Sequence, residues 1–211
     1  MCLSDPESYI YLSAIKSLAA LAIICTDDVL PVLIEEFHDN QRTHQERVNV
    51  GEVLVQLSKS IGDFAHHYSK QFIHCFLIGA KSPDEIIRVS SLSNLGQFCS
   101  VLKFSLGNYI VEIMLCVESL IKTDPSSEVK RAAIMLLNLI LNGIEIDNIE
   151  VIQDQLKRIN RLLKQVYNNS FFSDDVLKLH AELALEQINR IGRELLTPKN
   201  NLVKNIKILN L

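Results

Sequence analysis

The residues of this sequence that could bind a metal ion lie in one short stretch, at His66, His67, His74 and Cys75. Structural zinc usually takes four such ligands from two segments, at CxxC or HxxxH spacings. Neither spacing occurs here, and His67 and His74 instead fall two turns apart on one helix face. The pattern favours a histidine pair at a helix start and a core cysteine. A metal-binding or enzymatic helical domain built on these four residues is the alternative hypothesis.

Side chains suited to catalysis are scattered along the chain. Cys99 and Cys116 have apolar neighbours, with no base beside them to favour the reactive thiolate. Consecutive carboxylates such as Asp27-Asp28 and Glu35-Glu36 point in different directions on a helix. A glycine-rich phosphate-binding loop is absent from the sequence. We therefore expect a protein that is not an enzyme, without catalytic, cofactor-binding or metal-binding residues.

A basic stretch contains Lys157, Arg158, Arg161 and Lys164, which could meet an acidic partner or nucleic acid. Apart from Tyr167, no aromatic residue is interleaved with these cations to stack on bases. The net charge of −4 also argues against nucleic acid as a partner of the whole chain. The ordinary interpretation is a solvated helix face. Charge is unevenly spread along the chain, however, and such a distribution could also orient protein partners.

The composition of the chain predicts that the residues named above lie on helices. Hydrophobic residues make up 48% of the 211 residues, tryptophan is absent and aromatics are only 6%, which favours a globular, helical chain over a strand-rich one. No apolar run is long enough to cross a bilayer. Five cysteines without a CxxC pair, and no evident signal peptide, favour the cytosol or nucleus.

One helical pattern recurs along the chain and is clearest in Ile121–Gly143. Asp124 is the expected N-cap and Pro125 the first helical residue, followed by Val129-Lys130-x-x-Ala133, which places an apolar and a small residue on one face. Further copies begin at Ile10, Arg47, Ile87 and Leu177. Their spacing is close to that of HEAT units, which are about 40–47 residues long. The sequence predicts an all-α HEAT- or armadillo-like solenoid of about nine helices in roughly four and a half repeats.

The ends of the chain and two further helix starts complete this prediction. Ser82 and Ser173 are the expected caps of their helices. The solenoid domain is expected to span residues 1–198, and the apolar and basic tail 199–211 to cover its last repeat as a cap or to dock into a partner. The first copy of the pattern lies in a helix of the kind that comes second in a two-helix repeat, and no first helix precedes it. We therefore expect the C-terminal part of a longer solenoid, or else an unusual terminal cap.

These helices resemble the C-terminal region of the transport and Golgi organisation protein 6 family, also described as RNA polymerase II assembly factors. The resemblance is carried by Glu7–Ala22, Val29–Phe37, Val50–Leu54, Arg88–Cys99, Val129–Ala133 and Leu179–Ile188. It implies a non-enzymatic protein-binding scaffold that acts in protein secretion and Golgi organisation, or in RNA polymerase II assembly and nuclear import.

The resemblance also implies partners and a location. The partners would be RNA polymerase II subunits with assembly chaperones, or secretory-pathway components, and no nucleic acid is expected. The location would be cytoplasmic, with shuttling to the nucleus or association with Golgi or ER membranes. A peripheral membrane trafficking component is a further alternative, which the tail and the basic helix allow.

Overall fold

The computed structural model describes residues 7–143, 149–150, 152–168 and 174–196. Within them the chain forms nine α-helices and two 3-10 helices. The α-helices are α1 (Ser8–Ile24), α2 (Thr26–His38), α3 (His44–Ile61), α4 (Ser69–Gly79), α5 (Glu85–Leu102), α6 (Ile110–Thr123), α7 (Ser127–Gly143), α8 (Gln153–Asn168) and α9 (Asp175–Leu196). The 3-10 helices are η2 (Gly62–Tyr68) and η3 (Lys103–Asn108). The predicted all-α solenoid is confirmed.

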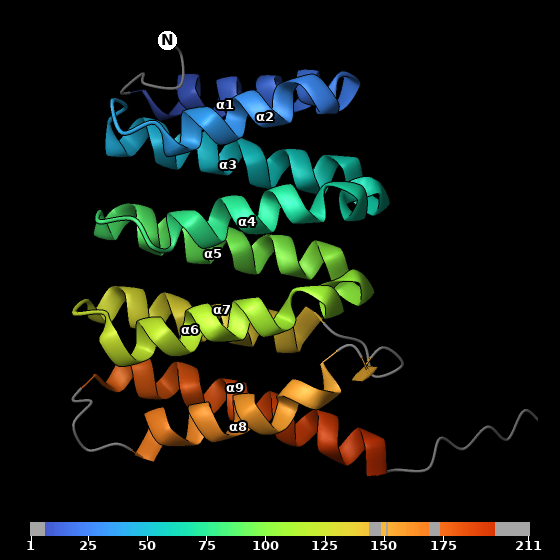
Figure 1. Cartoon of the computed structure of the whole chain (residues 1–211), viewed down its shortest axis with the longest axis vertical. Helices are drawn as coiled ribbons and strands as arrows, with labels where there is room; N and C mark the ends of the chain where they lie inside the picture. The colour runs from blue at the N-terminus through green and yellow to red at the C-terminus, as the bar shows by residue number, and fades with distance from the viewer. Residues whose placement is uncertain (1–6, 144–148, 151, 169–173, 197–211) are drawn as a thin grey trace, which may run out of the picture.

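The helices stack as hairpins, in chain order from α1 to α9 (Figure 1). Each even-numbered helix pairs with the odd-numbered helix that follows it, and each odd helix also packs on the next odd helix. Successive even helices lie farther from one another than successive odd helices do. We call the more closely packed layer of odd helices the inner face and the layer of even helices the outer face.

Aliphatic and aromatic side chains fill the space between the two layers. Phe37, Phe72, Phe76 and Phe98 are fully buried. The rings of Phe72 on α4 and Phe98 on α5 lie 4.7 Å apart between centroids, so they hold one hairpin together. No helix in the described part of the chain is both long and apolar enough to span a membrane.

Side-chain pairs link α3 to α5, α5 to α7 and α7 to α9 near the N-terminal ends of these helices. His44 pairs with Asp84, and Arg88 pairs with Asp124 at 2.8 Å. The pair between Arg131 and Asp174 has the same contact distance, 2.8 Å. The second pair is almost fully enclosed, with side-chain exposures of 12% and 5%. We call these three contacts the inter-repeat ladder.

The ladder explains why the predicted helix caps are wrong by one or two residues. Helix α5 is capped by Asp84, whose carboxylate accepts from a first-turn N–H at 2.8 Å, and Ser82 lies before it. Helix α7 is capped by the Ser126 hydroxyl, while Asp124 accepts from the Ser126 N–H at 2.9 Å. For α9 the cap is Asp174, and Ser173 lies outside the described residues. Each aspartate thus serves the turn and the ladder together.

Four of the five predicted repeat positions are buried. Ile87, Val129 and Leu177 lie in the core. Arg47 is also buried, and its guanidinium donates to the Phe37 carbonyl at 2.8 Å. Ile10 is 39% exposed, so the copy predicted there is wrong, and α1 buries Ile15, Ala19 and Ala22 instead. The predicted end of the domain at residue 198 and the predicted tail 199–211 lie outside the described residues.

Candidate functional site

The four residues of the metal hypothesis do not converge. His66 and His67 lie in η2 with their rings against each other, 4.0 Å apart between centroids. On α4, the exposed His74 faces Glu112 at 3.6 Å, whereas the adjacent Cys75 is buried in the core. Among the residues that the structure describes, no group of three or more His, Cys, Asp or Glu side chains is placed to hold a metal ion.

The candidate nucleophiles sit in surroundings that suppress their reactivity. Cys99 and Cys116 are buried, and burial raises the pKa of both thiols. A raised pKa keeps the neutral thiol, which is a poor nucleophile and a poor metal ligand. Both cysteines therefore act as small core residues.

The inner face carries a groove that runs across α3, α5 and α7. It has a volume of about 520 Å³. We call it the odd-face groove, and it is lined by Val48, Glu52, Glu85, Ile86, Val89, Ser90, Ser93, Asn94, Gln97 and Glu128. A second hollow of about 310 Å³ shares Val89, Ser93 and Glu128 with it and continues toward α9. The two together form a recessed surface that spans four odd helices, α3, α5, α7 and α9.

The apolar part of the groove comes from aliphatic side chains of α3 and α5 that are exposed or half-buried. Ile86 is 55% exposed at its centre, and Val48 and Val89 are half-buried beside it. Exposed aliphatic groups in a recess favour contact with apolar side chains of another molecule. The groove therefore offers hydrophobic contact as well as polar groups.

Three glutamates give the groove its charge. Glu52 accepts from the Gln56 side chain at 2.9 Å, and Glu85 accepts from the Ser126 hydroxyl at 2.7 Å. Glu128 pairs with Arg131 at 2.5 Å. An ionised carboxylate has about four acceptor sites, so each glutamate keeps capacity for a further donor. The groove thus presents carboxylates around an aliphatic floor.

The helices that carry the groove are held at fixed spacing. The Arg88–Asp124 pair of the ladder joins α5 to the start of α7. Gly51 lies where α3 approaches α5, and a Cβ there would meet the Asn94 amide at 2.6 Å. The absence of a side chain at Gly51 therefore allows this close packing. A preorganised groove loses less entropy when a ligand binds.

The predicted basic stretch lies on α8, on the outer layer of even helices. Arg158 points to Glu118 on α6 and donates to its two carboxylate oxygens at 2.6 and 2.8 Å. Lys157, Arg161 and Lys164 are exposed on the same helix. Sequence reasoning found these four cations, but it missed that α6 adds charged groups to the same surface.

The chain matches a family model described as "Required for nuclear transport of RNA pol II C-terminus 1" over residues 1–64. It is 30% identical over 212 residues to Transport and Golgi organization protein 6 of Drosophila melanogaster. The alignment covers 99% of this chain and 23% of that protein. The chain therefore spans about a quarter of the length of this curated relative.

Among solved structures, a mutant of Kap121p gives a TM-score of 0.67 at 18% identity, over 91% of this chain and 19% of that one. Kap121p bound to Ste12p gives 0.65 at 16% identity, over 90% and 18%. An engineered protein gives 0.52 at 17% identity, over 90% and 94%. Likeness at these identities shows the fold alone. The chain is an α-solenoid similar to the transport and Golgi organisation protein 6 and RNA polymerase II transport family, which confirms the resemblance predicted from its sequence.

Proposed function

We propose that this chain is a non-enzymatic protein-binding scaffold whose odd-face groove holds an extended segment of a partner protein. The observation that carries the proposal is the combination, in one groove, of exposed aliphatic side chains with Glu52, Glu85 and Glu128. Aliphatic groups between carboxylates complement a segment in which lysine or arginine alternates with apolar residues. Such a segment is the proposed ligand class.

Physical chemistry supports an extended ligand. In an extended peptide, alternate side chains point to opposite sides, so one set can contact the floor around Ile86 while the other reaches the glutamates. Each hydrogen bond to a charged group contributes roughly 1.5–3 kcal/mol. A surface that extends over four odd helices can make several such contacts at once.

The similar proteins support a role in holding other proteins. One is named for Golgi organisation, and the matching family is described as required for nuclear transport of RNA polymerase II. Two of the similar Kap121p structures contain a bound protein, Ste12p in one and the extreme C-terminus of the protein phosphatase Cdc14p in the other. We propose RNA polymerase II subunits with assembly chaperones, or secretory-pathway components, as partners, and a cytoplasmic location with access to the nucleus or to Golgi and ER membranes.

The test measures binding of a fluorescent peptide that alternates lysine with leucine. We expect Glu52→Lys and Ile86→Asp each to weaken binding about tenfold or more, because the first reverses a charge at the rim and the second places a charge on the floor. Glu35→Lys is the matched control, since Glu35 is exposed on α2 away from the groove. Equal losses in Glu52→Lys and the control would contradict the proposal.

A second experiment addresses the identity of the partner. Affinity capture with the wild-type chain, followed by mass spectrometry, is compared with capture by Glu52→Lys and by Glu35→Lys. Proteins that bind the wild type and the control but not Glu52→Lys are partners of the groove. Polymerase subunits in that set would support the nuclear role, and Golgi or coat components would support the secretory role.

A further inference from the structure

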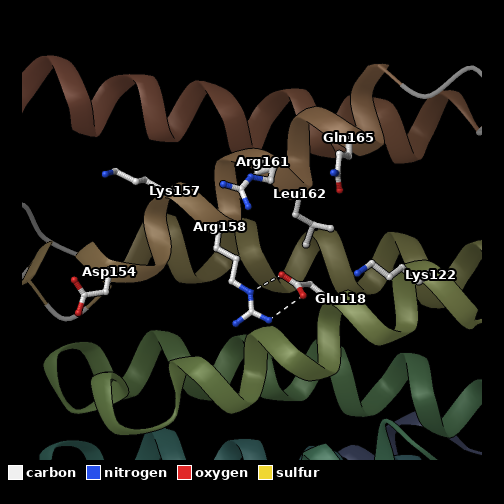
Figure 2. Close-up of a pocket in the computed structure, with 8 residues that line it drawn as sticks. All are labelled: Glu118, Lys122, Asp154, Lys157, Arg158, Arg161, Leu162 and Gln165. Carbon is white, nitrogen blue, oxygen red and sulfur yellow. Dashed lines mark hydrogen bonds and ion pairs between the residues drawn. The ribbon is translucent and has the colours of Figure 1, made fainter.

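A second surface, of opposite charge, lies on the outer layer between α6 and α8. It is a hollow of about 460 Å³. We call it the basic hollow, and its lining is Glu118, Lys122, Asp154, Lys157, Arg158, Arg161, Leu162 and Gln165 (Figure 2). Four cations against two carboxylates give the lining a net charge of +2. This surface shares no residue with the odd-face groove.

One ion pair defines the hollow and takes up one of its two carboxylates. Figure 2 shows Arg158 reaching from α8 to Glu118 on α6, with both hydrogen bonds drawn. The pair ties the two walls together in a bidentate geometry. Asp154, the second carboxylate, lies in the first turn of α8, where the helix dipole favours a negative charge. Both carboxylates are therefore already stabilised, Glu118 by Arg158 and Asp154 by the helix dipole.

Three further cations of α8, two of them in the lining of the hollow, have no such partner in the described part of the chain. Lys157, Arg161 and Lys164 occupy one face of α8, because they are separated by four and three residues. Within the described part of the chain, no hydrogen bond or ion pair joins any of these three to a carboxylate. Like charges at these spacings destabilise a helix, and a bound anion would relieve that repulsion.

The cationic surface continues beyond the hollow. A neighbouring recess of about 590 Å³ shares Lys157, Arg161 and Gln165 and adds Asn160, Lys164 and Asn168. Its lining contains no acidic residue. The amide side chains add neutral donors to the ammonium and guanidinium groups, and all of these can donate to carboxylate oxygens.

We propose that the basic hollow binds an acidic segment of a partner protein, rich in glutamate or aspartate. A guanidinium such as that of Arg161 matches a carboxylate in a bidentate geometry. Lys122 and Lys157 stand on either side of it in the lining and can take neighbouring carboxylates. The one apolar residue of the lining, Leu162, is almost fully buried, so the lining offers the ligand mainly polar contacts.

Two other polyanions fit this surface less well. Single-stranded nucleic acid is usually held by aromatic side chains that stack on bases, and the lining has none. An anionic membrane surface is met by exposed apolar side chains that insert between lipids, whereas the one apolar residue of the lining, Leu162, is only 5% exposed. The carboxylates of an acidic peptide stand on separate side chains, so they can contact the cations while they lie away from Glu118 and Asp154.

The test measures binding of a fluorescent glutamate-rich peptide to the chain. We expect the double variant Lys157→Glu/Arg161→Glu to weaken binding about tenfold or more, since two contacts become repulsive. The matched control is Lys16→Glu/Lys70→Glu, which changes the net charge equally at two exposed residues outside the hollow. We expect this control to bind within about twofold of wild type, and salt to weaken binding in the wild type and in this control.

Further arms separate the possible ligands from one another and from folding. The neutral variant Lys157→Gln/Arg161→Gln, checked by circular dichroism, should also lose affinity while it keeps the wild-type helicity. Glu52→Lys, in the odd-face groove, should retain the acidic peptide. The proposal is overturned if the two charge-reversed proteins bind the peptide equally, or if only a single-stranded oligonucleotide or phosphatidylserine vesicles bind in a way that depends on Lys157 and Arg161.

Discussion

The odd-face groove and the basic hollow have opposite charge although they lie on the same stack of helices. On the inner side, the ladder engages Arg88 and Arg131, and glutamates remain at the rim of the groove. On the outer side, the carboxylate that α6 contributes to the hollow, Glu118, is paired with Arg158, and in the described part of the chain Lys157 and Arg161 form no ion pair across the gap. The charge of each surface thus follows from which side chains the stack uses to hold itself together.

The largest effect is expected when the ladder is broken. Arg88→Ala leaves Asp124 without its partner in an almost fully enclosed position, and removing one partner of a buried pair costs about 3–5 kcal/mol. Because α5 and α7 carry the odd-face groove, we expect the basic peptide to lose affinity as well. Chemical denaturation gives the free energy of unfolding.

The matched change on the outer side is Arg161→Ala, which removes an exposed guanidinium without a carboxylate partner. Its cost should lie within about 0.5 kcal/mol of zero. Similar losses of stability in the two variants would show that the ladder does not distinguish the two faces.

A smaller effect is expected from two glycines. In Gly51→Ala the new methyl group would meet Asn94 at 2.6 Å and the Phe37 ring at 3.0 Å, and such overpacking costs about 1–3 kcal/mol. In Gly192→Ala, nothing lies within 4 Å of the new atom, so we expect a gain of about 0.5–1 kcal/mol from helix propensity. Thermal denaturation of both variants separates the close approach at the groove from an open helix position.

The smallest effect concerns the ion pair of the basic hollow and its dependence on pH. The hydrogen bonds from Arg158 lower the pKa of Glu118 in the folded chain. A lowered pKa gives stability that is present above the ordinary glutamate pKa and is lost as the pH falls through the folded value. Because the pair is partly exposed, its contribution is about 0–1 kcal/mol.

We therefore expect the melting temperature of Arg158→Gln to approach that of the wild type as the pH is lowered through the acidic range, and to lie below it at neutral pH. A difference that grows on acidification would contradict the assigned direction. Arg131→Gln provides a comparison on the inner side, because Arg131 likewise lowers the pKa of Asp174.

The sequence predicted the fold because its main signal, a recurring apolar and small residue, is local. It did not predict the helix caps, because Asp124 and Asp174 are also bound by Arg88 and Arg131, which lie 36 and 43 residues earlier in the chain. Ile10 was misassigned because several apolar registers fit α1, and only its packing on α3 selects Ile15.

The two surfaces were only partly predictable for the same reason. The resemblance implied a protein-binding scaffold, but Glu52, Ile86 and Glu128 come from three different helices and share no motif. The cations of α8 are neighbours in sequence and were therefore found, whereas Lys122 joins them only because α6 lies against α8.

The most direct test of the central claim is a cross-comparison of two ligands with two variants. The lysine–leucine peptide and the glutamate-rich peptide are each titrated into wild type, Glu52→Lys and Lys157→Glu/Arg161→Glu. We predict that Glu52→Lys loses only the basic peptide and that the double variant loses only the acidic one. If either variant weakened both peptides equally, or if Glu52→Lys bound the basic peptide as tightly as the wild type, the odd-face groove would not be the binding site of a scaffold.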